Sequence, residues 1–143
     1  MAPDPFVVVG GDAAGLSAAS KFVRERSNSR DVVVLERGSW VSYAHCGTPY
    51  YVKGEVDSLL DLTTLSPDDV AERGIDLRRG HEVTALAPDR DAVRVAGPDG
   101  AFDQPFSDLL VATGATASDG PFDLSPAGAF TLHGMDDAAA LRA

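Results

Sequence analysis

The sequence predicts an α/β fold that combines a parallel sheet with a small antiparallel meander. Two short β-branched runs, Phe6–Val9 and Val32–Leu35, lack polar alternation, as strands buried on both faces do. A helix-like segment joins them, and such a connection makes the two strands parallel. Beyond residue 80, short apolar runs alternate with turn signals, which is typical of antiparallel strands.

The first half of the chain has a β-strand, a helix and a second β-strand. After the first strand, residues 10–15 form a glycine-rich turn. Leu16–Arg26 is rich in alanine and serine and carries its basic residues late, which predicts a helix. The second strand ends at Glu36. Together these elements form a βαβ unit, whose crossover should be right-handed.

The second half begins with an irregular segment, residues 37–62. Ser66 and Asp69 then predict a capping box, with Pro67 at the first position of a helix that stops at Gly74. The later predicted strands are Ile75–Arg78 in the parallel sheet, Glu82–Leu86, Ala92–Ala96 and Ala101–Phe106 in the meander, and a fully buried Leu109–Ala112. Residues 117–128 are interpreted as a loop, and a last helix covers Asp136–Ala143.

The charge of the chain excludes several classes of function. Twelve Lys and Arg residues against 22 Asp and Glu residues give a net charge of −10, which repels phosphate backbones and argues against nucleic-acid binding. The only lysines are Lys21 and Lys53; this acidic, lysine-poor character suggests a salt-adapted protein, the alternative being an ordinary acidic one. No apolar run approaches the ~20 residues of a membrane span, and the start does not resemble a signal peptide. We therefore expect a cytoplasmic protein that does not enter a membrane.

The glycine turn and Glu36 predict a dinucleotide site. Gly10 permits the tight turn, Gly15 lets the helix pack close to the strand, and the helix N-terminus favours a diphosphate. Asp12 replaces the usual middle glycine, and we interpret it as pointing away to cap a helix N–H. Glu36 lies about 20 residues after Gly15, where an acidic side chain binds an adenosine ribose. The alternative is a turn glycine and a solvated glutamate.

Four segments carry a resemblance to a known family: Val9–Ser20, Leu35–Gly38, Val41–Tyr51 and Leu110–Ala115. In this order they resemble the single-cysteine branch of the pyridine nucleotide-disulfide oxidoreductases, which includes coenzyme A-disulfide reductase and related NADH oxidases. The stretch around the cysteine is the most specific, and the resemblance covers essentially the whole chain. It implies a Rossmann-like FAD/NAD(P)-binding domain.

The resemblance implies that Cys46 is the redox centre, placed against the flavin and cycling between a thiolate and a mixed disulfide with CoA or a sulfenic acid. Local chemistry agrees, because a thiolate needs nearby positive charge or helix N–H groups, and His45 adjoins it. A single cysteine forms no intrachain disulfide, so its partner must be a small thiol, CoA or the flavin. The alternative for a lone cysteine is a buried structural thiol.

The resemblance also implies ligand contacts residue by residue. The FAD contacts are Gly10, Gly11, Ala14, Gly15, Glu36, Arg37, Ser42, Thr113 and Gly114. The CoA contacts are Ser17, Lys21, Arg24, Ser42 and His45. Asparagine usually occupies the last of these positions in the reductases, which leaves the CoA specificity open, and Lys21 and Arg24 could instead be plain helix-surface charges.

Ala13 stands where the peroxidase branch has histidine, so peroxide chemistry is less favoured. His81 and His133 have no metal-ligand spacing and are interpreted as structural or surface residues.

Family members are much longer than this chain. Residues 1–143 are therefore expected to be the N-terminal segment of the FAD-binding domain, without the NAD(P)H domain, the second FAD segment and the dimerisation domain. The predicted function is an FAD-dependent NAD(P)H oxidoreductase of the CoA-disulfide reductase or NADH oxidase type, homodimeric when complete and inactive as this segment alone. The alternative is a non-catalytic adenine-dinucleotide-binding fragment or module. The electron acceptor and the choice between NADH and NADPH remain open.

Overall fold

The computed structural model describes residues 3–25, 30–118, 120–121 and 128–143. It divides into two compact units: unit 1 comprises Met1–Ser42 and Leu65–Thr113, and unit 2 comprises Tyr43–Thr64 and Gly114–Ala143. The predicted helix end at Arg26, and part of the predicted loop 117–128, lie outside the described residues. Each unit is described by itself.

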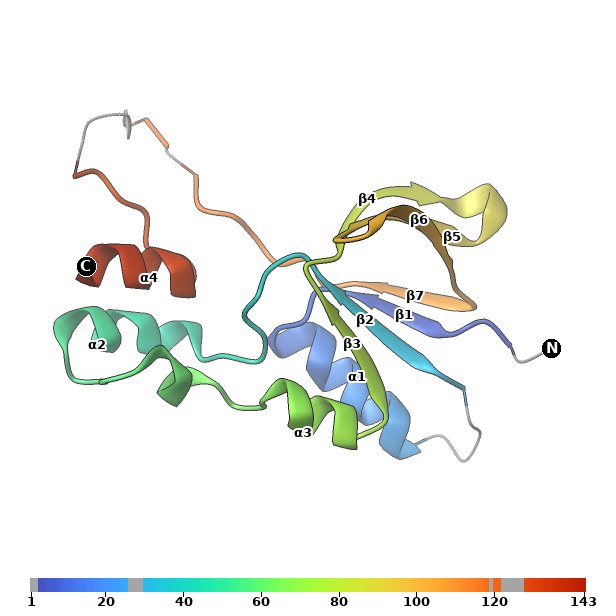
Figure 1. Cartoon of the computed structure of the whole chain (residues 1–143), viewed down its shortest axis with the longest axis horizontal. Helices are drawn as coiled ribbons and strands as arrows, with labels where there is room; N and C mark the ends of the chain where they lie inside the picture. The colour runs from blue at the N-terminus through green and yellow to red at the C-terminus, as the bar shows by residue number, and fades with distance from the viewer. Residues whose placement is uncertain (1–2, 26–29, 119, 122–127) are drawn as a thin grey trace. The chain divides into compact units, whose positions relative to one another are not determined.

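Unit 1 is built on a parallel four-stranded sheet in the order β3-β2-β1-β7 (Figure 1). Its strands are β1 (Phe6–Val9), β2 (Val32–Glu36), β3 (Ile75–Arg79) and β7 (Asp108–Val111). Helix α1 (Ala13–Glu25) connects β1 to β2, and it begins three residues before the predicted helix. The predicted βαβ unit and parallel sheet are confirmed.

Both faces of the sheet are covered, because successive side chains of a strand point to opposite sides. Val8 and Val34 pack with Leu16 and Ala19 of α1 on one face. On the other face, buried apolar side chains pack against strand β5; these are Val7, Val33 and Leu35 with Val93 and Val95. The absence of polar alternation in the first two strands is thus explained by burial on both sides.

A second helix, α3 (Pro67–Glu72), precedes β3 and begins with the predicted capping box. The Ser66 hydroxyl oxygen accepts from the Asp69 N–H at 3.1 Å, and the Asp69 carboxylate accepts from the Ser66 N–H at 2.8 Å. Pro67 occupies the first helical position, where a missing N–H costs nothing. This start fixes Val70, which is fully buried, in the core shared with α1.

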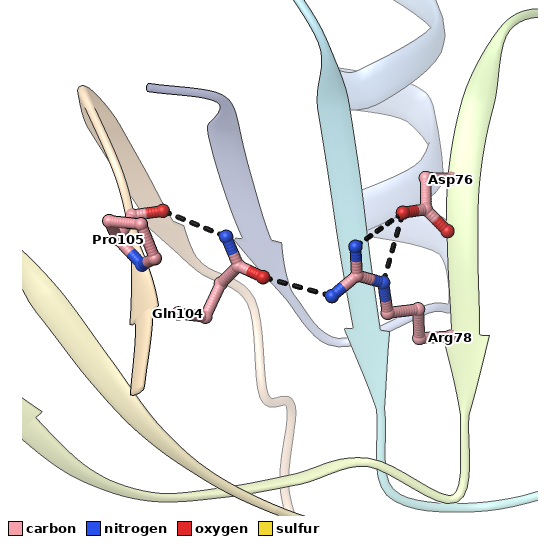
Figure 2. A network of polar contacts seen from close by, with 4 residues as sticks. All are labelled: Asp76, Arg78, Gln104 and Pro105. Carbon is pink, nitrogen blue, oxygen red and sulfur yellow. Dashed lines mark hydrogen bonds and ion pairs between the residues drawn. The ribbon is translucent and has the colours of Figure 1, made fainter. Parts of the chain in front are cut away.

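The connection from β3 to β7 is an antiparallel meander of β4 (Glu82–Ala87), β5 (Ala92–Gly97) and β6 (Gly100–Pro105). The three predicted meander strands are confirmed. Figure 2 shows how the meander is tied to the parallel sheet. Arg78 of β3 donates to the side-chain oxygen of Gln104 in β6 at 2.9 Å, and the Gln104 amide donates to the Pro105 carbonyl at 3.0 Å. Gln104 is only 8% exposed.

Strand β7 differs from the prediction. Its apolar run predicts full burial, yet Leu109 and Leu110 are half-buried and Val111 is 62% exposed. The physical reason is its place in the sheet: among the described residues β7 pairs with β1 alone and forms an edge. An apolar run indicates a strand but does not tell an edge strand from a central one.

Unit 2 contains most of residues 37–62, the segment for which the sequence predicted no helix or strand. It contains the short helical turns η1 (His45–Gly47) and η2 (Leu59–Leu62), helix α2 (Thr48–Lys53) and helix α4 (Met135–Arg142). Helix α4 matches the last predicted helix and packs along α2 (Figure 1). The Arg142 guanidinium lies 4.4 Å from the Tyr51 ring centre and donates to the Val56 carbonyl at 2.7 Å. Within the described part of the chain, no helix has the length and apolar character to cross a membrane.

Candidate dinucleotide and cysteine sites

The turn between β1 and α1 requires glycine at two positions. Gly10 has a φ of +110°, and a Cβ placed there would lie 2.2 Å from the Ala112 carbonyl oxygen. A Cβ on Gly15 would lie 1.9 Å from the Gly10 carbonyl oxygen. Ala13 and Ala14, in the first turn of α1, are exposed and small. The backbone at this helix N-terminus is therefore accessible to a diphosphate, which the N–H groups and the helix dipole favour.

Glu36 is joined to the same turn. One of its carboxylate oxygens accepts from the Gly11 N–H at 2.7 Å, and the other accepts from the Gly38 N–H at 2.7 Å. A carboxylate has about four acceptor positions, so each oxygen can accept one more hydrogen bond, for example from a ribose hydroxyl. Glu36 thus orders the glycine turn and keeps the capacity to bind an adenosine, and these residues fit an adenine dinucleotide.

The other predicted cofactor contacts divide between the two units. Ser42 is buried, has a φ of +49° that is unusual for a residue other than glycine, and donates its N–H to the Gly11 carbonyl at 3.1 Å. Thr113 is exposed and its nitrogen would lie 3.4 Å from a Cβ on Gly10. Arg37 is exposed after the end of β2. Gly114 is exposed with a φ of +65° and belongs to unit 2.

The predicted CoA contacts of α1 lie on its exposed surface. Ser17, Lys21 and Arg24 follow at intervals of four and three residues, which places them on one face of the helix. Lys21 pairs with Glu25 at 2.5 Å, and both side chains are well exposed. An exposed pair of this kind contributes little, so the lysine can leave it for a stronger anion. The fifth predicted contact, His45, lies in unit 2.

Cys46 lies in the turn η1 and is exposed, which excludes the alternative of a buried structural thiol. The turn is fixed by packing and by backbone bonds. A Cβ on Gly47 would lie 2.4 Å from a methyl carbon of Leu62, so glycine lets η1 pack against η2. The Ala44 N–H donates to the Leu62 carbonyl at 2.8 Å, and the Thr48 hydroxyl donates to the His45 carbonyl at 2.8 Å. The exposed sulfur is thus presented from an ordered turn.

His133, which carries no signal of a site in the sequence, contacts the residue beside the cysteine. The His45 Nδ1 lies 3.1 Å from the His133 carbonyl oxygen, and the two imidazole ring centres are 5.6 Å apart. The Tyr43 ring also contacts His45, at 4.4 Å between centres. His45 and His133 are 88 positions apart in the chain, so no local pattern signals the contact. Among the residues that the structure describes, no group of three or more His, Cys, Asp or Glu side chains is placed to hold a metal ion.

Comparison with protein families gives a match along almost the whole chain. The family model of the pyridine nucleotide-disulphide oxidoreductases matches residues 4–143. The match therefore includes the glycine turn, Glu36, the cysteine turn and the end of β7. It agrees with the resemblance seen in the sequence motifs.

Proteins similar to this chain include sulfur and disulfide reductases and an NADH oxidase. The chain is 39% identical over 141 residues to the NAD(P)H sulfur oxidoreductase (CoA-dependent) of Pyrococcus abyssi, covering 95% of this chain and 30% of that protein. It is 29% identical over 138 residues to the coenzyme A disulfide reductase of Staphylococcus haemolyticus, covering 94% and 31%. A solved NAD-dependent persulfide reductase from A. fulgidus matches with a TM-score of 0.88 at 28% identity, covering 96% and 27%. The chain thus spans about 30% of the length of these relatives.

Proposed function

Because the chain belongs to the pyridine nucleotide-disulphide oxidoreductase family, we propose that it is the FAD-binding, cysteine-bearing part of an NAD(P)H-dependent oxidoreductase. The proposed acceptor is a small thiol compound or disulfide, with CoA derivatives favoured and oxygen as the alternative. The observation that carries the proposal is the bond between Glu36 and the Gly11 N–H, which joins a ribose-binding carboxylate to a turn suited to a diphosphate.

The proposed FAD contacts follow from this arrangement. The first turn of α1, where Ala13 and Ala14 are small and exposed, would hold the diphosphate. Glu36 would accept hydrogen bonds from the ribose. The remaining contacts are proposed for Gly11, Ala14, Arg37, Ser42, Thr113 and Gly114. When bound, FAD supplies two-electron transfer between NAD(P)H and sulfur.

Cys46 is proposed as the residue that reacts with the acceptor. Its thiolate attacks one sulfur of a CoA disulfide, so that a new S–S bond forms and the other CoA leaves as a thiolate. Two electrons and one proton then convert the mixed disulfide into the Cys46 thiolate and a second CoA thiol. The exposure of Cys46 supports this role, because a sulfur must be accessible to exchange with a disulfide.

The proposed CoA contacts are Ser17, Lys21 and Arg24 on α1, Ser42 in the same unit, and His45 in unit 2. Lys21 and Arg24 are cations on a chain with a net charge of −10. The phosphate groups of CoA would form ion pairs with these two side chains. The weak Lys21–Glu25 pair would open when a phosphate binds.

Hydride transfer from NAD(P)H and assembly as a homodimer are proposed for the complete enzyme, because the chain spans about 30% of its relatives. A single cysteine that must return to the thiolate suits a reducing compartment, and we place the enzyme in the cytoplasm.

The proposal is tested on the purified chain in two steps. Titration with FAD, followed by flavin fluorescence anisotropy, should show saturable binding that the Glu36→Gln variant weakens. Incubation with CoA disulfide should add one CoA to the intact mass, and the Cys46→Ser variant should gain none. FAD binding without CoA transfer would support a non-catalytic dinucleotide-binding module instead, and the loss of both in folded protein would overturn the proposal.

A further inference from the structure

Unit 1 contains a small polar cavity at the amino edge of its parallel sheet. The cavity has a volume of about 220 Å³ and lies where β2 and β3 begin, next to Asp31 and Gly74. Glu36 and the glycine turn stand at the carboxyl ends of β2 and β1, so about 15 Å of strand separates them from the cavity. The cavity therefore lies at the opposite edge of the sheet from the proposed dinucleotide site.

The walls of the cavity come from the parallel sheet and from the meander. Asp76 pairs in register with Val33, which packs against β5, so Asp76 and Arg78 lie on the face of the sheet that the meander covers. Gln104 of β6 lines the cavity from the meander and is only 8% exposed. A methyl group added at Gly74 would meet nothing within 4 Å, so this end of the cavity is open.

The charged groups of the lining leave one negative charge uncompensated. Arg78 donates twice to Asp76 Oδ2, at 2.6 and 2.9 Å, and once to the Gln104 oxygen at 2.9 Å (Figure 2). The charge of Arg78 is thus balanced by Asp76. Among the residues that the structure describes, none forms a hydrogen bond or an ion pair with the Asp31 carboxylate. A cation in the cavity would balance the charge of Asp31.

The lining also offers acceptors for the three N–H groups of a primary ammonium. The Asp31 carboxylate supplies two oxygens, and Asp76, which accepts from Arg78 through Oδ2, keeps Oδ1 for a further bond. The Gln104 oxygen has two lone pairs, of which Arg78 uses one. A quaternary ammonium has no N–H and could not use these acceptors. The volume is enough for several water molecules, and hence for a small amine that displaces them.

We propose that this cavity binds a small primary amine in its ammonium form. Asp31 supplies the opposite charge, and Asp76 and Gln104 accept hydrogen bonds from the N–H groups. The net charge of −10 attracts cations to the chain as a whole, and the cavity offers them a defined position. The bound amine would join β3 to β6 beside the bond between Arg78 and Gln104. This inference does not depend on FAD, NAD(P)H or the cysteine.

The test is a titration of the isotope-labelled, purified chain with butylammonium chloride at pH 7 and constant ionic strength, followed by NMR. The signals of the Gln104 side-chain NH₂ and of the Gly74 and Asp76 backbone N–H groups should shift along a saturating curve. Asp31→Asn should weaken the binding at least about threefold. Asp89→Asn is the matched control, because Asp89 is an exposed acid of the meander that does not line the cavity.

Two further compounds separate charge from hydrogen bonding. Tetramethylammonium carries the charge without N–H groups, and butanol has the carbon chain without the charge, so neither should give a saturating shift. Saturation by tetramethylammonium equal to that by butylammonium, or equal binding by Asp31→Asn and the unmodified chain, would overturn the inference. A lysine with both ends blocked carries the same ammonium on a larger body, and tighter binding of this compound would overturn the assignment to a small free amine.

The outcome is separable from that of the proposed function. None of these titrations uses FAD, NAD(P)H or CoA, so they remain informative if FAD binding or CoA transfer fails. Asp31→Asn should bind FAD and accept CoA as the unmodified chain does, because Asp31 lies at the other edge of the sheet.

Discussion

Gly15 packs so closely onto Gly10 that a methyl group at position 15 would lie 1.9 Å from the Gly10 carbonyl oxygen. This contact brings the start of α1 to the end of β1, and the same methyl group would meet Val8 at 3.1 Å. The obstructing atom belongs to the backbone, which cannot rotate away as a flexible side chain can. Glycine at position 15 is therefore a packing requirement, whatever the turn binds.

Gly15→Ala is expected to lower the free energy of unfolding by about 3 kcal/mol or more, since overpacking against the backbone forces the strand and helix apart. Urea denaturation of the ligand-free chain measures the change. Gly74→Ala is the matched control: Gly74 has a φ of +78°, and a methyl group added there would meet nothing within 4 Å. That variant bears only backbone strain, of about 1–2 kcal/mol. Equal losses in the two variants would show that the close contact is not the source of the cost.

A second prediction concerns Glu36, whose two carboxylate oxygens accept from different N–H groups. Glu36→Gln keeps one oxygen and turns an NH₂ group toward the other donor. Losing a hydrogen bond to a charged acceptor costs about 1.5–3 kcal/mol, so the chain should be less stable even without ligand, and affinity for FAD should fall at least about tenfold.

Glu25→Gln is the control for charge, because it removes an acidic group from the exposed surface of α1. Denaturation of the ligand-free chain and titration with FAD separate the two roles of Glu36. A variant that unfolds like the unmodified chain but binds FAD poorly would mean that the carboxylate serves the ligand and not the turn.

The third prediction concerns the polar link between the parallel sheet and the meander (Figure 2). Arg78 donates to the Gln104 side chain, while Asp76 accepts two hydrogen bonds from the same guanidinium. Gln104→Met keeps the volume and removes both polar groups of the amide, its oxygen and its NH₂. It should cost about 1–2 kcal/mol, because the Pro105 carbonyl loses its donor and the arginine loses an acceptor.

A double-mutant cycle with Arg78→Met and Gln104→Met isolates the pair, with a coupling energy of about 1 kcal/mol expected. Urea denaturation of the four proteins provides the data. A coupling near zero would mean that this polar pair does not help to hold the meander against the sheet.

The elements of unit 1 could be predicted because their signals are local. Strands β1 and β2 bury both faces and so lack polar alternation, and the Ser66–Asp69 box marks the start of α3 by its own hydrogen bonds. The edge position of β7 could not be predicted, since Leu109 and Leu110 are as apolar as residues of a central strand. What pairs with a strand depends on distant parts of the chain.

The candidate sites, too, could be predicted only where their signals are local in the sequence. The glycine turn and Glu36 follow a fixed spacing, so the sequence predicts their proximity, and the Glu36–Gly11 bond agrees with it. The helical turns around Cys46 are three to six residues long, too short for a periodic pattern to appear. The contact between His45 and His133 depends on how α4 packs along α2, which no spacing in the sequence encodes.

The last prediction concerns acid stability and the capping box of α3. The side-chain and backbone hydrogen bonds from Ser66 lower the pKa of Asp69 below the ordinary value of 3.8. A carboxyl whose pKa is lower in the folded chain contributes stability that is fully present above its unfolded pKa and is lost as the pH falls through the folded value. The contribution of Asp69 should therefore be constant from neutral pH down to about pH 5 and should be lost progressively below about pH 4, as the pH falls through the lowered folded pKa.

Asp69→Asn should accordingly lower the unfolding midpoint in urea at pH 7, and this difference should shrink as the pH falls below about 4 through the lowered folded pKa of Asp69. Asp68→Asn removes a neighbouring charge from the first turn of the same helix without breaking the box, and it should have the smaller effect at pH 7. Because α3 anchors the buried Val70, a weakened box should loosen the core beside α1, and amide exchange in both helices should rise together. A difference between Asp69→Asn and the unmodified chain that does not shrink at all as the pH is lowered below about 4, down to the acid unfolding of the chain, would contradict the assignment of the effect to the ionised carboxylate.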